Sequence, residues 1–151
     1  MLDAATLYQD LILDHSRRPR GYCFPEHANC EAHGHNPLCG DRLTVKLREE
    51  DDVVVDVGFQ GSGCAISTAA ASTMTEAVSG KSRSEVLALA SRFRDLVTGQ
   101  IDPSEARDLG KLAAFAGVSK FPMRVKCATL AWHTLVAALE GRTAATTESD
   151  E

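Results

Sequence analysis

The sequence lacks an apolar run long enough to cross a bilayer, since its longest stretch of small residues, Ala65 to Ala77, is interrupted by serines and threonines. Residues 1–5 also lack the basic segment and apolar run of a secretory signal. There is no excess of positive charge: the net charge is −5, which argues against a general nucleic-acid-binding protein. We therefore expect a soluble cytoplasmic protein whose partner is another protein or a small inorganic species.

Disulfide bonds are not required for stability in a chain of this length. A chain of 151 residues buries roughly 70% of its unfolded surface without covalent staples. The five cysteines are an odd number, and no secretory signal accompanies them. This combination favours a reducing compartment in which the thiols bind metal or react.

The sequence shows no internal repeat and no alternation of strands with helices. Apolar residues alternate over residues 43–47 and again over 53–59, on either side of an acidic turn at 49–52, which predicts an antiparallel hairpin. Residues 29–35 are a candidate third strand. The apolar face of the second segment is expected to consist of Val53, Val55, Val57 and Phe59.

Helical spacing dominates the remainder of the chain. Residues 4–16 and 65–78 each predict a helix, and Ser82 with Glu85 forms a capping box that opens another. A start signal at 102–105 and a segment over 126–140 predict two more. The apolar face after residue 105 is expected to consist of Leu109, Leu112, Ala113 and Ala116.

Strands precede most helices, so the sequence predicts an α+β fold, a small three-stranded antiparallel sheet packed with about five helices. We expect one domain over residues 1–141. The acidic tail at 142–151 has no apolar periodicity and is predicted to be disordered.

Three short motifs place a cysteine beside glycine or a charged residue. They read Asn36-Pro37-Leu38-Cys39-Gly40-Asp41, Gly61-Ser62-Gly63-Cys64 and Arg124-Val125-Lys126-Cys127. Cys39 and Asp41 are two residues apart and can face the same way. Cys64 and Cys127 are each expected to open a helix, where backbone N–H groups favour a thiolate.

A soft divalent metal ion held by three thiolates and one carboxylate requires this set of side chains. We therefore predict one metal site made of Cys39, Asp41, Cys64 and Cys127. With Zn²⁺ the site carries a formal charge of −2, which neighbouring cations can offset: Arg42, Arg124 and Lys126. The single oxygen ligand is a plausible point for ligand exchange, although a purely structural zinc site remains an alternative.

The other candidate ligands have weaker support. Cys23 and Cys30 are more simply interpreted as small buried apolar residues. His35, close to Cys39 in sequence, is kept as a substitute ligand. His133 lies six residues after Cys127 and is expected on a different helical face.

Together with Leu7-Tyr8, Asp14-His15 and Pro19-Arg20-Gly21, the three motifs resemble the IscU-like iron–sulfur cluster assembly family, and within it the SufU-type branch. The similarity extends to about Gly141. It implies an α+β fold with zinc bound by Cys39, Asp41, Cys64 and Cys127. IscU-type scaffolds have a histidine where this chain has Lys126, and residues 101–120 resemble the helical insertion of SufU-type proteins.

The resemblance also implies a reaction and a partner. A pyridoxal-phosphate cysteine desulfurase of the SufS type makes a persulfide, and this protein accepts the terminal sulfur on Cys39 and activates the desulfurase. Arg124 is implied to assist the transfer, which supplies downstream iron–sulfur assembly proteins. The alternative is a cluster assembly scaffold that holds iron or an iron–sulfur cluster on the same ligands.

Overall fold

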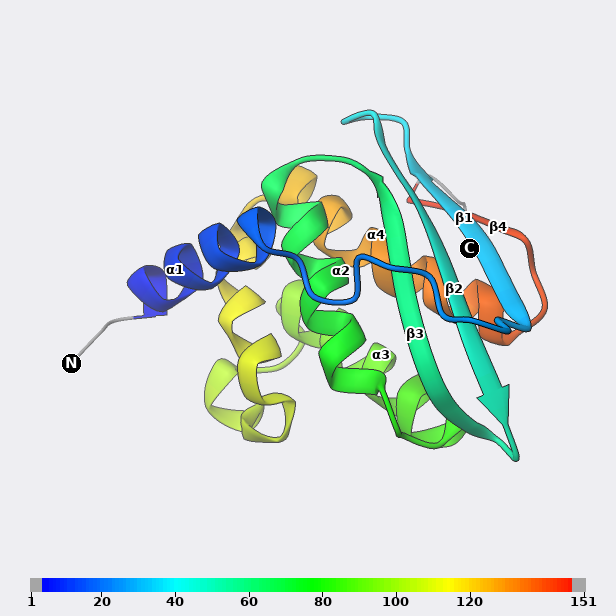
Figure 1. The fold of residues 1–151 in the computed structure, drawn as a ribbon. Helices are drawn as coiled ribbons and strands as arrows, with labels where there is room; N and C mark the ends of the chain where they lie inside the picture. Colours follow the sequence, from blue (N-terminus) through cyan, green and yellow to red (C-terminus); the bar gives the residue numbers. More distant parts are fainter. Residues whose placement is uncertain (1–3, 148–151) are drawn as a thin grey trace.

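The computed structural model describes residues 4–147, and its sheet is built on an antiparallel meander. The strands β1 (Cys30–Asn36), β2 (Asp41–Glu50) and β3 (Val53–Ser62) follow one another in the chain and pair in that order. The predicted hairpin and the candidate third strand are therefore confirmed. Figure 1 shows the sheet at one side of the molecule, with the helices packed on one of its faces.

A two-residue turn joins β2 to β3. Asp51 and Asp52 both have positive φ, 50° and 63°, as the tight hairpin turn that matches strand twist requires. A bulge between Arg48 and Glu49 then shifts the register of β3. As a result Val54 is buried and Val55 exposed, so the predicted alternation is wrong at its start, whereas Val57 and Phe59 face the core as expected.

A fourth strand, β4 (Ala144–Thr146), pairs in parallel with β1 at the sheet edge, so the sheet has one strand more than predicted. This strand follows the helix α4 (Pro122–Leu139). Gly141, at φ 78°, donates its N–H to the Ala138 carbonyl, and Arg142 donates to Ala137. These two bonds form a Schellman motif, which turns the chain back along the sheet.

The order of β4 differs from the disorder predicted for residues 142–151. Backbone hydrogen bonds to β1, rather than side-chain periodicity, hold this short strand. Residues 148–151 lie outside the described residues, and the domain boundary at residue 141 stays a prediction.

Three further α-helices match their predicted positions: α1 (Ala4–Arg17), α2 (Ala65–Val78) and α3 (Arg83–Val97). The capping box that opens α3 is present, with Ser82 and Glu85 bonding each other's backbone N–H. The small residues of α2 are largely buried, and α2 packs closely against α4. In turn α4 packs against β1, β2 and β4, and α2 contacts β3, so the two helices lie side by side against the sheet (Figure 1).

The segment predicted as a further α-helix forms two 3-10 helices, η1 (Pro103–Glu105) and η2 (Arg107–Lys120). Gly110, at φ 57° and ψ −128°, breaks η2 near its start. The buried residues of η2 are spaced by three: Leu109, Leu112, Phe115 and Val118. That spacing is the period of a 3-10 helix. The predicted face is therefore confirmed at Leu109 and Leu112, and Ala116 packs partly buried against the core, whereas Ala113 is not part of it.

Within residues 4–147 no helix combines the length and the apolar composition needed to cross a membrane.

Candidate metal centre

The loop between β1 and β2 presents Cys39. Asn36 and Asp41 face each other across the two strands, and the Gly40 N–H donates to the Asn36 carbonyl at 2.8 Å. Gly40 has a φ of 75°, a conformation that favours glycine. This turn leaves Cys39 exposed while Asp41, at the start of β2, is only 1% exposed.

Cys64 caps the N-terminus of α2, as the sequence predicts. Its Sγ accepts a hydrogen bond from the Ser67 N–H at 3.4 Å, and its own N–H donates to Asp41 Oδ1 at 2.9 Å. Gly63 allows this approach, because a Cβ there would lie 2.9 Å from the same Oδ1. The helix start and the carboxylate are thus joined through the backbone.

Cys127 does not open its helix, contrary to prediction. The helix α4 begins earlier, at Pro122, since proline is well suited to the first turn. Cys127 therefore lies in the second turn of α4, buried at 4% exposure, away from the free N–H groups of the helix end.

Three of the four predicted ligands nevertheless converge, and the fourth, Cys64, lies beside them. The ligand atoms of Cys39, Asp41 and Cys127 all lie within 4.8 Å of one another. The Cys127 and Cys39 sulfur atoms are 3.6 Å apart, and Cys64 Sγ lies 3.9 Å from Asp41 Oδ2. Cys64 thus contacts one edge of the group formed by the other three.

The thiols of Cys64 and Cys127 differ in acidity. The hydrogen bond with Cys127, followed by those from the backbone of Ser67 and Ile66, lowers the pKa of Cys64 to about 6. The same bond, together with burial, raises the pKa of Cys127. In the metal-free protein Cys64 is therefore the first of the pair to ionise.

This donor set fits a soft divalent ion. Two sulfur ligands of a tetrahedral ion lie about 3.8 Å apart when each bond is about 2.3 Å long. The observed 3.6 Å between the Cys39 and Cys127 sulfur atoms is close to that value. Three sulfur donors and one oxygen donor match an ion of the zinc type better than magnesium or calcium, which prefer oxygen.

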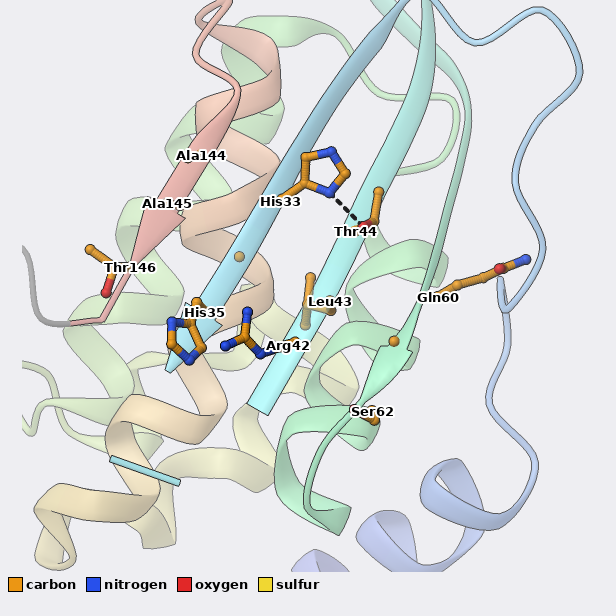
Figure 2. Close-up of a pocket in the computed structure, with 12 residues that line it drawn as sticks. His33, His35, Arg42, Leu43, Thr44, Gln60, Ser62, Ala144, Ala145 and Thr146 are labelled. Carbon is orange, nitrogen blue, oxygen red and sulfur yellow. Dashed lines mark hydrogen bonds between the residues drawn. The ribbon is translucent and has the colours of Figure 1, made fainter. Parts of the chain in front are cut away.

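The predicted cations Arg124 and Arg42 and the substitute ligand His35 lie outside the cysteine cluster. Arg124 is exposed in the first turn of α4, and its guanidinium lies 4.4 Å from the Phe121 ring centre. Arg42 and His35 lie together on the outer face of the sheet, in a pocket of about 720 Å³ (Figure 2). Because Asp41 is buried on the opposite side, neither residue joins the cluster.

The remaining cysteines lie outside the group. Cys30 is half-buried against the core, as predicted, whereas Cys23 is exposed, so its interpretation as a buried apolar residue was wrong. His133 is exposed on α4. Sequence reasoning assigned no role to Asn36, which is fully buried beside Asp41; its place in the first cysteine motif was the available signal.

Comparison with known proteins identifies the family. Residues 7–128 match the model of the NifU-like N terminal domain. The chain belongs to this family. One relative is the iron-sulfur cluster assembly scaffold protein IscU of Streptococcus pyogenes serotype M1. It is 42% identical over 140 residues, and the match covers 89% of this chain and 83% of that protein.

Another relative of this NifU-like domain protein is the zinc-dependent sulfurtransferase SufU of Bacillus subtilis (strain 168). It is 41% identical over 130 residues, covering 86% of this chain and 87% of that protein. The crystal structure of FiSufU, a SUF-system protein from Fervidobacterium islandicum AW-1, superposes with a TM-score of 0.80 at 35% identity. The match covers 91% of this chain and 99% of that one, which confirms the α+β fold.

Proposed function

We propose that this protein acts in iron–sulfur cluster biogenesis as a sulfur acceptor, receiving persulfide sulfur on Cys39 from a cysteine desulfurase and activating that enzyme. The observation that supports Cys39 is its exposure: it is accessible, whereas Cys127 and Asp41 beside it are buried. A thiol that must meet a sulfur donor on another protein has to be accessible. The naming of the Bacillus relative as a sulfurtransferase agrees with this proposal.

The transfer is a thiol–disulfide type of exchange. The Cys39 thiolate attacks the outer sulfur of the desulfurase persulfide, a new S–S bond forms, and the original S–S bond breaks. The desulfurase cysteine leaves as a thiolate, so no external oxidant or reductant is consumed. Cys39 Sγ lies 3.6 Å from Cys127 Sγ, so the attacking sulfur stays beside the other thiols of the cluster.

The resident ion in this proposal is zinc. Cys39, Asp41, Cys64 and Cys127 would hold it, and when bound it supplies positive charge that keeps the coordinating thiols deprotonated. The donor set and the name of the zinc-dependent Bacillus relative support this choice.

The surroundings of Cys39 suit a protein partner. Leu38 precedes Cys39 and is 50% exposed, and Phe121 and Met123 are comparably exposed in the segment that begins α4. Exposed apolar side chains beside a reactive group are typical of interaction sites. We propose that a SufS-type desulfurase, which carries the pyridoxal phosphate, covers this area, and that the nearby Arg124 pairs with the anionic persulfide.

Peptide mass spectrometry tests the acceptor. The zinc-loaded protein is incubated with a cysteine desulfurase and cysteine, and trapped persulfide is quantified at each thiol. We expect sulfur on Cys39, its loss in Cys39→Ser, and no change in Cys23→Ser, which removes another exposed thiol. Normal sulfur uptake by Cys39→Ser, or none by the unmodified protein, would overturn the proposal.

A cluster scaffold is the second candidate. Cys39 and Cys127, with Cys64 beside Asp41, also suit an iron–sulfur cluster, and the Streptococcus relative is named as a scaffold. Anaerobic reconstitution with iron and sulfide distinguishes the two functions. A cluster chromophore that moves intact to an apo-protein supports the scaffold, and its absence alongside sulfur on Cys39 supports the acceptor.

A further inference from the structure

The Asn36 side chain connects four groups around the cysteine cluster. Its Nδ2 donates to Asp41 Oδ2 at 3.4 Å and to Cys127 Sγ at 3.8 Å. Its Oδ1 accepts from the Leu38 N–H at 3.2 Å and from the Thr147 hydroxyl at 3.1 Å. Asn36 is fully buried, so these contacts are protected from competing water.

The chemistry of the partners fixes which way the amide points. The Leu38 backbone N–H can only donate, so the amide oxygen must face it. The amide nitrogen consequently faces Asp41 and Cys127, whose carboxylate and sulfur accept. A flipped amide would lose the bonds to the Leu38 N–H, Asp41 and Cys127, and Asn36 is therefore held in one orientation.

The C-terminal strand supplies one of these bonds. Pairing of β4 with β1 includes the bond from the His33 N–H to Thr143 and the bond from the Thr147 N–H to His35. This pairing brings the Thr147 hydroxyl onto Asn36. Since the turn at Gly141 leads directly from α4 into β4, the helix that carries Cys127 also delivers the residue that fixes Asn36.

We propose that Asn36 is a positioning residue for the cysteine cluster and that docking of β4, through the Thr147 hydroxyl, holds its side chain in place. With the amide fixed, Asp41 and Cys127 are held at the separation that ligation requires. When β4 leaves β1, Asn36 loses a partner and the cluster loosens, so the C-terminal strand modulates the site. The effect of β4 on sulfur transfer rests on the proposed function, whereas the effect of β4 on metal affinity does not.

Metal affinity provides the main test. Asn36→Leu keeps a similar size, adds no ligand atom and removes both Nδ2 donors, whereas Thr147→Val removes only the hydroxyl. Thr143→Val is the matched control: it is the same substitution on an exposed residue just before β4, whose side chain bonds to none of the described residues. Zinc affinity of each full-length variant is measured by competition with a chromogenic chelator.

We expect zinc affinity to fall about 10- to 100-fold in Asn36→Leu, the range for loss of an outer hydrogen bond to ligands. Thr147→Val should show a smaller fall of several-fold, and Thr143→Val none. Equal affinities for Thr147→Val and Thr143→Val would overturn the role of β4. Wild-type affinity in Asn36→Leu would overturn the role of Asn36.

A second readout uses the metal-free protein. Loosening of the cluster should speed alkylation of the buried Cys127 by iodoacetamide in Asn36→Leu and Thr147→Val, at wild-type circular dichroism, but not in Thr143→Val. Unchanged alkylation in Thr147→Val would contradict the proposal even if Asn36→Leu fails to fold. If affinities and alkylation shift as expected while the unmodified protein accepts no sulfur, Asn36 keeps its positioning role and only the proposed function fails.

Discussion

The backbone N–H of Cys64 donates a hydrogen bond to Asp41 Oδ1 over 2.9 Å. Asp41 begins β2 and Cys64 caps α2, so this single bond ties the sheet to the first helix that follows it. It also leaves Asp41 Oδ2 directed to the thiols, 3.9 Å from Cys64 Sγ. One carboxylate thus has a structural oxygen and an oxygen available for ligation.

The substitution Asp41→Asn should separate these two roles. The amide that replaces the carboxylate would keep an oxygen acceptor for the Cys64 N–H but would place its NH2 group against the buried Asn36 Nδ2, so the free energy of unfolding of the metal-free protein should fall by about 1–3 kcal/mol. Zinc affinity should fall by about 100-fold or more because an anionic ligand is lost. Chelator competition and urea unfolding of the metal-free protein measure the two quantities. Retention of wild-type zinc affinity would show that Asp41 is not a ligand.

Adding a methyl group at Gly63 should disturb Asp41 from outside the cluster. Its Cβ would lie 2.9 Å from Asp41 Oδ1 and 3.2 Å from Ser67 Oγ, so the carboxylate must shift. We expect Gly63→Ala to lower zinc affinity about tenfold. The control is Gly117→Ala, where a Cβ meets nothing within 4 Å and affinity should be unchanged. Equal affinities in both variants would contradict the close approach at Gly63.

Two adjacent valines test the register of β3. Val54 is 0% exposed and Val55 is 42% exposed, because the bulge shifts the strand. Val54→Ala should therefore reduce the free energy of unfolding by about 1–3 kcal/mol, and Val55→Ala by less than about 0.5 kcal/mol. Chemical denaturation of both variants measures this difference. A larger loss for Val55→Ala would restore the alternation predicted from the sequence.

His15 should make stability depend on pH. Burial, reinforced by Arg20, holds the pKa of His15 below its usual range, and its Nδ1 lies 2.7 Å from Ser72 Oγ. The Arg20 N–H also donates to that oxygen, which leaves the hydroxyl proton for Nδ1 of a neutral imidazole. Below about pH 6.5 the unfolded chain therefore binds a proton that the folded protein does not.

The stability that a neutral His15 provides is thus full above about pH 6.5 and is lost as the pH falls toward the lower pKa of the folded state. Between pH 7.5 and 5.5 the melting temperature of the wild-type protein should decrease more than that of His15→Gln. All other titrating groups are common to the two proteins, so the difference in slope reports His15. Parallel pH profiles would refute the assignment.

Local signals in the sequence are sufficient to predict where several helices start. The capping box at Ser82 and Glu85 predicts the start of α3 because both bonds lie within one helical turn. Cys64 was correctly placed at a helix start by the glycines before it. The apolar pattern predicts that α4 starts near Lys126, but the helix starts at Pro122, a favourable first-turn residue, and Cys127 consequently lies deeper in its helix than predicted.

The sequence by itself determined the set of chemical groups: three cysteines and an aspartate in short motifs whose turn and cap preferences act over a few residues. Only the tertiary structure decided how they are used, since the packing of α4 on the sheet buries Cys127 and Asp41 and leaves Cys39 exposed. The same holds for the bulge beside Val54, the strand β4 and the orientation of Asn36. The strand β4 and its bond to Asn36 depend on hydrogen bonds between residues distant in the chain, and the bulge depends on pairing between two strands, so a pattern read along one segment encodes none of them.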